Sequence, residues 1–156
     1  MADRNEEPHY PSDAIALLKT DHRKVKNLFA RYESAGSFST KHLIAEQVFT
    51  ELALHAQLEE NVFYPTVNEG TDEGPELVKA SLAEHQTMKQ LMQELRRMAH
   101  DTAEFDTKFQ ELIRNVEHHV EEEEAEMFPL AEEELAADLD EMSEEMQELK
   151  ADLQGS

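Results

Sequence analysis

The chain contains no cysteine, and this absence removes several kinds of chemistry at once. Disulfide bonds, thiolate metal ligands and cysteine nucleophiles are all excluded. Tryptophan is also absent, only 6% of residues are aromatic, and glycine and proline together account for nine of 156 positions. Because Leu, Ala, Glu, Gln and Lys are abundant instead, the composition favours one helical domain with a sizeable core.

Positive charge is scarce as well, with 14 basic residues against 36 acidic ones and a net charge of −22. A surface of this sign repels phosphate, so we expect neither nucleic acid nor an anionic membrane as a partner. The first residues are polar and acidic, unlike a signal peptide, and no apolar run reaches membrane-spanning length. The expected location is the cytoplasm.

Between the few glycines and prolines, apolar residues recur every three or four positions, which is the spacing of helices. Short connections between long helices make neighbours antiparallel, so the predicted fold is all-α, an up-down-up-down four-helix bundle. The bundle is expected at residues 12–130, after a flexible N-terminal tail at residues 1–11. The four helices are predicted over residues 13–34, 39–68, 75–100 and 103–129.

A fifth apolar stripe follows at residues 131–156, and its opposite face is almost entirely acidic. This pattern predicts an amphipathic C-terminal helix that packs on the bundle or offers a surface to a partner. A frayed, solvated tail is the alternative. The whole chain is expected to be a monomer or a weak homodimer. The stripe consists of Leu135, Leu139, Met142, Met146, Leu149 and Leu153.

Four histidines and two glutamates interrupt the apolar stripes, and they recur in the same order in each half of the chain. The first histidine repeats after 63 positions and the second after 64, and a glutamate follows each second histidine by four residues. Residues four apart share a helix face, so all six point toward the expected bundle axis. They are His22, His55 and Glu59, and then His85, His119 and Glu123.

Metal binding explains this pattern better than apolar packing does. Unpaired carboxylates and imidazoles are costly to bury, and a bound cation neutralises the former and uses the lone pairs of the latter. Nitrogen and oxygen ligands without sulfur suit iron or manganese, and zinc less exclusively. A single core histidine is more often hydrogen-bonded than metal-bound, so the inference depends on the matched repetition over four helices.

Other polar residues fit the pattern less well. His42 lies off its stripe and His100 at a helix end, so both are expected at the solvated surface. His118 is one residue, or about 100° of rotation, from the stripe, which leaves partial burial open. Glu60 and Glu124 repeat off the stripe and are either hydrogen-bond partners of the ligands or surface charges.

Two prolines, Pro65 and Pro129, also repeat, and they are expected to end or kink the second and fourth helices. The complete set of repeated residues resembles the hemerythrin-like, or HHE cation-binding, family over about residues 12–130. The resemblance rests on His22, the segment from His55 to Pro65, the pair Glu84 and His85, and the segment from His119 to Pro129.

This resemblance implies a four-helix bundle around two iron ions, joined by an oxo or hydroxo bridge and two carboxylates. Manganese or zinc are the implied substitutes. The implied iron ligands are His22, His55, His85 and His119, with Glu59 and Glu123 as the bridging carboxylates.

One position departs from the oxygen-carrying members of that family, which have a second histidine one turn after the first on the third helix. Here the position is Lys89. The departure leaves about two iron coordination positions, instead of one, for water, a substrate or a further ligand. Tyr32, on the first helix, is a candidate for one of them, although a core aromatic is the simpler interpretation.

Two classes of function remain open. In the first, the centre binds and turns over oxygen, peroxide or nitric oxide, as a peroxidase-like, catalase-like or nitric-oxide-handling protein. In the second, it stores oxygen reversibly, or senses oxygen or iron, without turnover. A ferritin-like oxidase is disfavoured because those bundles use Glu-x-x-His, which occurs here only from Glu6 to His9.

Overall fold

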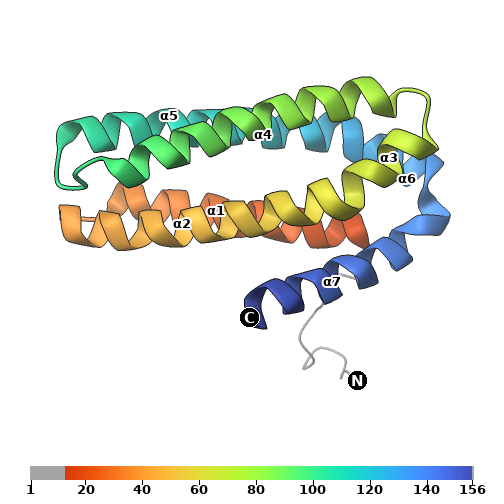
Figure 1. Cartoon of the computed structure of the whole chain (residues 1–156), viewed down its shortest axis with the longest axis horizontal. Coiled ribbons are helices and arrows are strands. Elements are labelled where there is room, and N and C mark those ends of the chain that lie inside the picture. Colours follow the sequence, from red (N-terminus) through yellow and green to blue (C-terminus); the bar gives the residue numbers. More distant parts are fainter. Residues whose placement is uncertain (1–12, 156) are drawn as a thin grey trace.

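The computed structural model describes residues 13–155, and four long helices in them run side by side with alternating direction (Figure 1). The predicted all-α, up-down-up-down bundle is therefore confirmed. The predicted tail at residues 1–11 lies outside the described residues. The four long helices are α1 (Ala14–Ser34), α2 (Phe38–Leu58), α4 (Gly74–Arg97) and α5 (Ala103–Glu122).

Side-chain caps fix where three of these helices begin. The Asp13 carboxylate accepts a hydrogen bond from the Ala16 N–H, and the Ser37 and Thr102 hydroxyls accept from the N–H groups of Thr40 and Phe105. Such caps satisfy backbone donors that the first helical turn leaves unpaired. All three helices start within two residues of the predicted positions.

The second and fourth helices depart from the prediction, because each contains a wider π-helical turn. The turns are η2 (Glu59–Phe63) and η3 (Glu123–Met127), followed by α3 (Tyr64–Gly70) and α6 (Phe128–Glu134). Pro65 and Pro129 lack the N–H that would continue the α-helical pattern. The N–H groups of the preceding Tyr64 and Phe128 bond five residues back, to the carbonyls of Glu59 and Glu123. The prolines therefore reshape these helices without ending them.

The apolar core is divided into two clusters. One cluster fills the bundle between residues 25 and 56 and residues 88 and 116. The other lies at the opposite end, from residues 14–18 and 58–78 to residues 127–146. The six repeated histidines and glutamates lie where the two clusters meet along the helices, so they form a polar layer inside the bundle.

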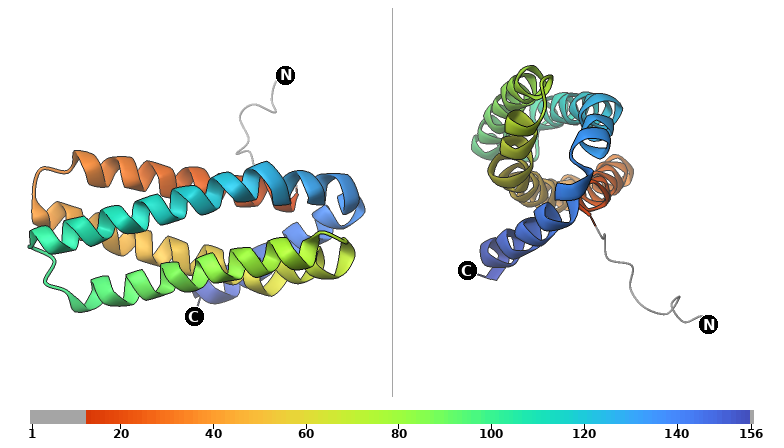
Figure 2. Two further views of the ribbon diagram at one scale, coloured as in Figure 1. Left: turned by 90° about the horizontal axis from the view of Figure 1, so that it is seen from above. Right: turned by 90° about the vertical axis from the view of Figure 1, so that its right-hand side faces the viewer.

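A fifth helix, α7 (Leu139–Gly155), follows the short 3-10 turn η4 (Ala136–Asp138) and packs outside the ring of four against α1 and α2 (Figure 2). It buries Leu139, Met142 and Met146 in the second cluster. The alternative of a frayed tail is therefore wrong. No helix within residues 13–155 is both long and apolar enough to cross a membrane.

Candidate metal centre

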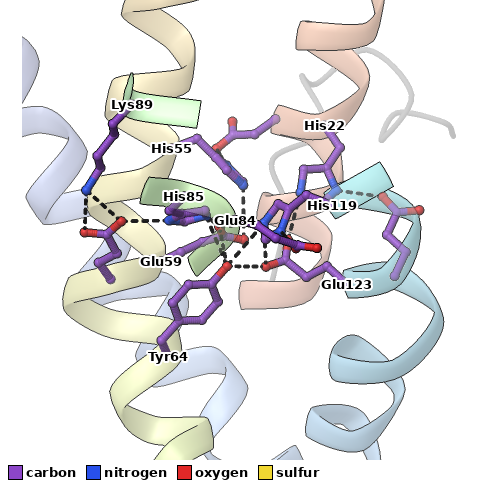
Figure 3. Close-up of polar contacts among 12 residues, drawn as sticks. His22, His55, Glu59, Tyr64, Glu84, His85, Lys89, His119 and Glu123 are labelled. Atoms are coloured by element: carbon purple, nitrogen blue, oxygen red, sulfur yellow. Dashed lines mark hydrogen bonds and ion pairs between the residues drawn. The ribbon is translucent and has the colours of Figure 1, made fainter. Parts of the chain in front are cut away.

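The polar layer brings the side chains of all four long helices together at the bundle axis (Figure 3). Each helix contributes one histidine, and the two π-helical turns begin at the two glutamates. All six side chains are buried, with Glu59 at 0% exposure. The residues are His22 on α1, His55 on α2, Glu59 on η2, His85 on α4, His119 on α5 and Glu123 on η3.

One group of donors consists of His22, His55, Glu59 and Glu123, each offering one atom within 4.8 Å of the others. The Nε2 atom of His22 lies 3.1 Å from Glu123 Oε1, and that of His55 lies 3.1 Å from Glu59 Oε2. All four of these atoms are buried and have no hydrogen-bond partner among the described residues. Buried polar atoms in native proteins are nearly always paired, so this convergence fits a cation.

A second group consists of Glu59, His85 and His119, again with donor atoms within 4.8 Å of one another. The His85 Nε2 atom lies 3.0 Å from Glu59 Oε1, and the His119 Nε2 atom lies 3.5 Å from Glu123 Oε2. Each glutamate thus directs one oxygen to the first group and the other oxygen to the second. This is the arrangement that two bridging carboxylates require.

The histidine rings are held in place by a surrounding set of carboxylates. Each ring donates a hydrogen bond from Nδ1 to a carboxylate oxygen at 2.6–2.9 Å, which turns Nε2 toward the bundle axis. Carboxylate partners of this kind orient metal-binding imidazoles and raise their basicity. The pairs are His22 with Glu124, His55 with Asp21, His85 with Glu60, and His119 with Glu84.

These pairs settle the role that the sequence left open for Glu60 and Glu124, which are hydrogen-bond partners. Sequence reasoning missed the same role for Asp21 and Glu84. The signal was present, because each of these acids directly precedes the first histidine of its half and they are 63 positions apart. Both act on a different helix from their own, which the spacing of a single helix does not reveal.

The histidines and glutamates of the layer shift one another's pKa values. Burial alone would lower the pKa of His55, but the charge of Glu59 and the hydrogen bond and charge of Asp21 raise it to about 10. In His119, burial is likewise outweighed by Glu123 and Glu59, which raise the pKa to about 11. Although burial opposes ionisation of Glu59, the surrounding histidines hold its pKa well below the ordinary value.

Tyr64 belongs to the site, although sequence reasoning did not find it. Its hydroxyl oxygen lies 2.6 Å from Glu123 Oε2, 2.9 Å from Glu59 Oε1 and 3.2 Å from His85 Nε2 (Figure 3). The π-helical turn explains the omission, because the wider turn brings the fifth residue after Glu59 onto the face that α-helical spacing assigns to others. Burial and the two carboxylates raise the pKa of the Tyr64 phenol.

The two halves of the repeat differ at this position. Phe128 stands 64 positions after Tyr64, and its ring stacks on His22 with centroids 5.6 Å apart. A phenol therefore faces the second donor group, and an aromatic ring without a hydroxyl covers the first.

The remaining candidates lie elsewhere. Tyr32 donates a hydrogen bond to Asp106 at 3.0 Å and packs in the first apolar cluster, so it is a core aromatic. His118 is exposed beside Glu84 and Glu122. Lys89 pairs with Glu60 at 3.0 Å, which connects it to His85 only through that carboxylate.

His42 and His100 stack on each other with centroids 4.0 Å apart. Both are far along the chain from the polar layer, and neither belongs to a group of three or more metal-binding side chains among the described residues. This agrees with their exclusion from the predicted ligands.

A four-helix bundle with a buried layer of histidines and shared glutamates defines a class of helical proteins suited to metal binding. The chain belongs to the hemerythrin HHE cation binding domain family, since the model of that family matches residues 13–131. The resemblance predicted from the repeated residues is thereby confirmed.

Two known proteins are similar to this chain over part of their own length. An uncharacterized hemerythrin-like protein of Schizosaccharomyces pombe is 31% identical over 126 residues, which are 80% of this chain and 61% of the relative. A DNA nickase of Nostoc is 28% identical over 112 residues, which are 72% of this chain and 31% of the nickase. The chain thus spans less than two thirds of the length of either relative.

The same fold occurs in a crystal structure of a hemerythrin HHE cation binding domain-containing protein from Mycobacterium kansasii. The two structures superpose with a TM-score of 0.72 at 22% sequence identity. The superposition covers 90% of this chain and 88% of the other. It therefore extends over more of the chain than residues 13–131, which match the family model.

Proposed function

We propose that this protein is a non-haem di-iron protein that binds, and turns over, oxygen, peroxide or nitric oxide. The observation that carries the proposal is the layer of four unpaired buried donor atoms, with two glutamates facing both donor groups. Family membership supports a metal ion in this layer. Nitrogen and oxygen donors support iron, with manganese or zinc as substitutes.

The proposed ligands are the six residues expected from the sequence. His22 and His55 would hold one iron ion, and His85 and His119 the other. Glu59 and Glu123 would bridge both ions, together with an oxo or hydroxo group. The carboxylates on the four Nδ1 atoms keep each ring in the ligating orientation without any movement of the backbone.

Tyr64 is the proposed seventh side chain of the centre. Its hydroxyl lies among the donors of the second group, within 3.4 Å of both His85 Nε2 and His119 Nε2. It would ligate the second ion as a phenolate, or donate a hydrogen bond to a bridging oxygen. Either role makes the two iron positions chemically different.

Bound iron would supply electrons and act as a Lewis acid toward a small ligand. The chain's own contribution is to orient the imidazoles, to keep water out with the two apolar clusters, and to leave room for a ligand. A cavity of about 20 Å³, close to the size of one water molecule, borders all four histidines on the side of the first apolar cluster.

Reversible oxygen storage, or oxygen or iron sensing, is the second candidate, and Tyr64 favours it. With lysine at position 89 in place of a histidine, about two iron coordination positions are free. As a ligand, Tyr64 would occupy one of them and leave one free position, as in an oxygen carrier. The sequence argument for turnover rested on that extra free position.

Kinetics on the iron-loaded protein separate the two candidates. Turnover predicts consumption of peroxide or nitric oxide at a rate well above that of the same concentration of free iron. Storage predicts an oxygenated absorption spectrum that disappears when oxygen is removed, without consumption. A rate no higher than that of free iron would contradict the turnover proposal.

A further inference from the structure

Two surface clefts flank the polar layer, and the internal repeat relates them to each other. One cleft, of about 350 Å³, lies between α1 and α5, and the other, of about 220 Å³, lies between α2 and α4. Residues that line the first cleft have counterparts in the second at the same offsets of 63 and 64 positions. Examples are Lys26 and Lys89, and Glu121 and Gln57.

The α1/α5 cleft lies closer to the donors than its counterpart does. It borders His22 itself, and it shares Val25, Val116 and Val120 with the small cavity that borders the four histidines. Of these valines, only Val120 is partly exposed. The α1/α5 cleft and the cavity are therefore separated by the side chains of these three valines and of His22.

The α2/α4 cleft is closed by comparison. It borders none of the six candidate ligands, and it shares only Ala56 and Met88 with the inner cavity, both of which are buried. Lys89 crosses this cleft to Glu60, with Nζ 3.0 Å from Oε2. Its counterpart Lys26 forms no ion pair with any carboxylate of residues 13–155. The α1/α5 cleft therefore has the His22–Glu124 hydrogen bond at its edge, but no lysine pairs across it.

We infer that small apolar molecules reach the centre through the α1/α5 cleft, past a gate formed by Val25, Val116 and Val120. This inference rests on the proposed function and concerns the route to the centre, which favours the neutral diatomic molecules of the proposed set over peroxide. Valine offers no hydrogen bond, so an ion or a polar molecule would pay for desolvation at the gate, whereas a neutral diatomic molecule would not. The route leads first to the donor group that contains His22.

The matched pair Glu121→Trp and Gln57→Trp tests the route. Both positions are exposed, both line their clefts, and they are equivalent in the repeat. In stopped-flow measurements with nitric oxide as a neutral probe, Glu121→Trp should slow association and dissociation severalfold and leave the equilibrium constant unchanged. Gln57→Trp and the charge control Glu121→Gln should keep the wild-type rates. Val120→Ala, which widens the gate, should accelerate both steps.

An equal effect of the two tryptophans, or no effect of Glu121→Trp, would overturn the route. A second measurement does not depend on iron chemistry. In the zinc-loaded protein under oxygen pressure, paramagnetic relaxation of the Val25, Val116 and Val120 methyl groups should exceed that of the Met92 methyl group, which is buried and lines the α2/α4 cleft but not the inner cavity. Equal relaxation would overturn the route as well. If iron-loaded wild-type protein bound neither nitric oxide nor oxygen and consumed no peroxide, the proposed function would fail, and the relaxation measurement would still decide the route.

Discussion

At the scale of single residues, the centre combines two kinds of information. The six proposed ligands lie on the apolar stripes of α-helices, so their spacing identifies them in the sequence. The residues that orient them, and Tyr64 between the two donor groups, follow from contacts between helices or from a π-helical turn. The periodicity of a single helix reveals neither a contact between helices nor a π-helical turn. For this reason the roles of Asp21, Glu84 and Tyr64 were not predicted.

Replacement of Tyr64 by phenylalanine tests its place in the centre. The hydroxyl lies within hydrogen-bond distance of Glu59 and Glu123, while the ring is buried and would remain. We expect Tyr64→Phe to fold, to keep two metal ions, and to lose any phenolate-to-iron absorption band. Tyr32→Phe, which removes the hydroxyl of another buried tyrosine, is the matched control and should leave the spectrum unchanged. An identical spectrum in Tyr64→Phe would contradict direct ligation.

The raised pKa values of His55 and His119 predict that metal binding releases protons. Both groups have folded-state pKa values of about 10 and 11, so both are protonated at pH 8 without metal, whereas ligation requires neutral imidazole. Titration of metal-free protein with zinc at pH 8, in buffers of different ionisation enthalpy, should show release of about two protons per chain. Metal affinity should therefore rise with pH up to about 10. Binding without proton release would contradict the assignment.

The same raised pKa values predict how the stability of the metal-free fold changes with pH. Because folding raises these pKa values above the ordinary histidine value, the stabilisation is fully present below about pH 6.5. It is lost as pH rises through 10 to 11. Unfolding by urea at a series of pH values should show this decrease in metal-free protein, and a smaller one in metal-loaded protein, where the imidazoles carry no such proton.

At the scale of elements, the π-helical turns and α7 distinguish this chain from four simple helices. Each turn places a glutamate at its first residue, and in η2 it also places Tyr64 on the inner face. The matched prolines, Pro65 and Pro129, predicted an irregularity at both places. They did not predict that it would be a π-helical turn. Pattern analysis did predict α7 as an amphipathic helix, because its stripe is as regular as those of the bundle.

The packing of α7 predicts a large difference between two neighbouring substitutions. Met146 is fully buried in the second apolar cluster, whereas Glu148 is exposed on the same helix. Met146→Ala should lower the free energy of unfolding by about 2–4 kcal/mol, from lost burial and a residual cavity. Glu148→Ala should change it by less than about 0.5 kcal/mol. Equal effects in urea unfolding would show that α7 does not stabilise the bundle.

At the scale of the whole molecule, the chain is a duplicated scaffold with one asymmetric centre. The fold class, the helix order and the six converging residues followed from the sequence, since they depend on helical spacing and on the offsets of 63 and 64 positions. What did not follow is the difference between the halves. One difference is Tyr64 against Phe128. The other is that Lys89 pairs with Glu60, whereas Lys26 forms no ion pair within residues 13–155. Both depend on side-chain positions across helices.

Metal content with the visible spectrum, measured on wild type and two neighbouring variants, tests the central claim most directly. The account predicts two irons per chain and oxo-to-iron absorption bands in wild type. His119→Ala should abolish the bands, because His119 is buried beside Glu59 and Glu123. His118→Ala, at an exposed position one residue away, should keep both the iron and the bands. Loss of the bands in His118→Ala with retention in His119→Ala, or no bound metal in wild type, would contradict the account.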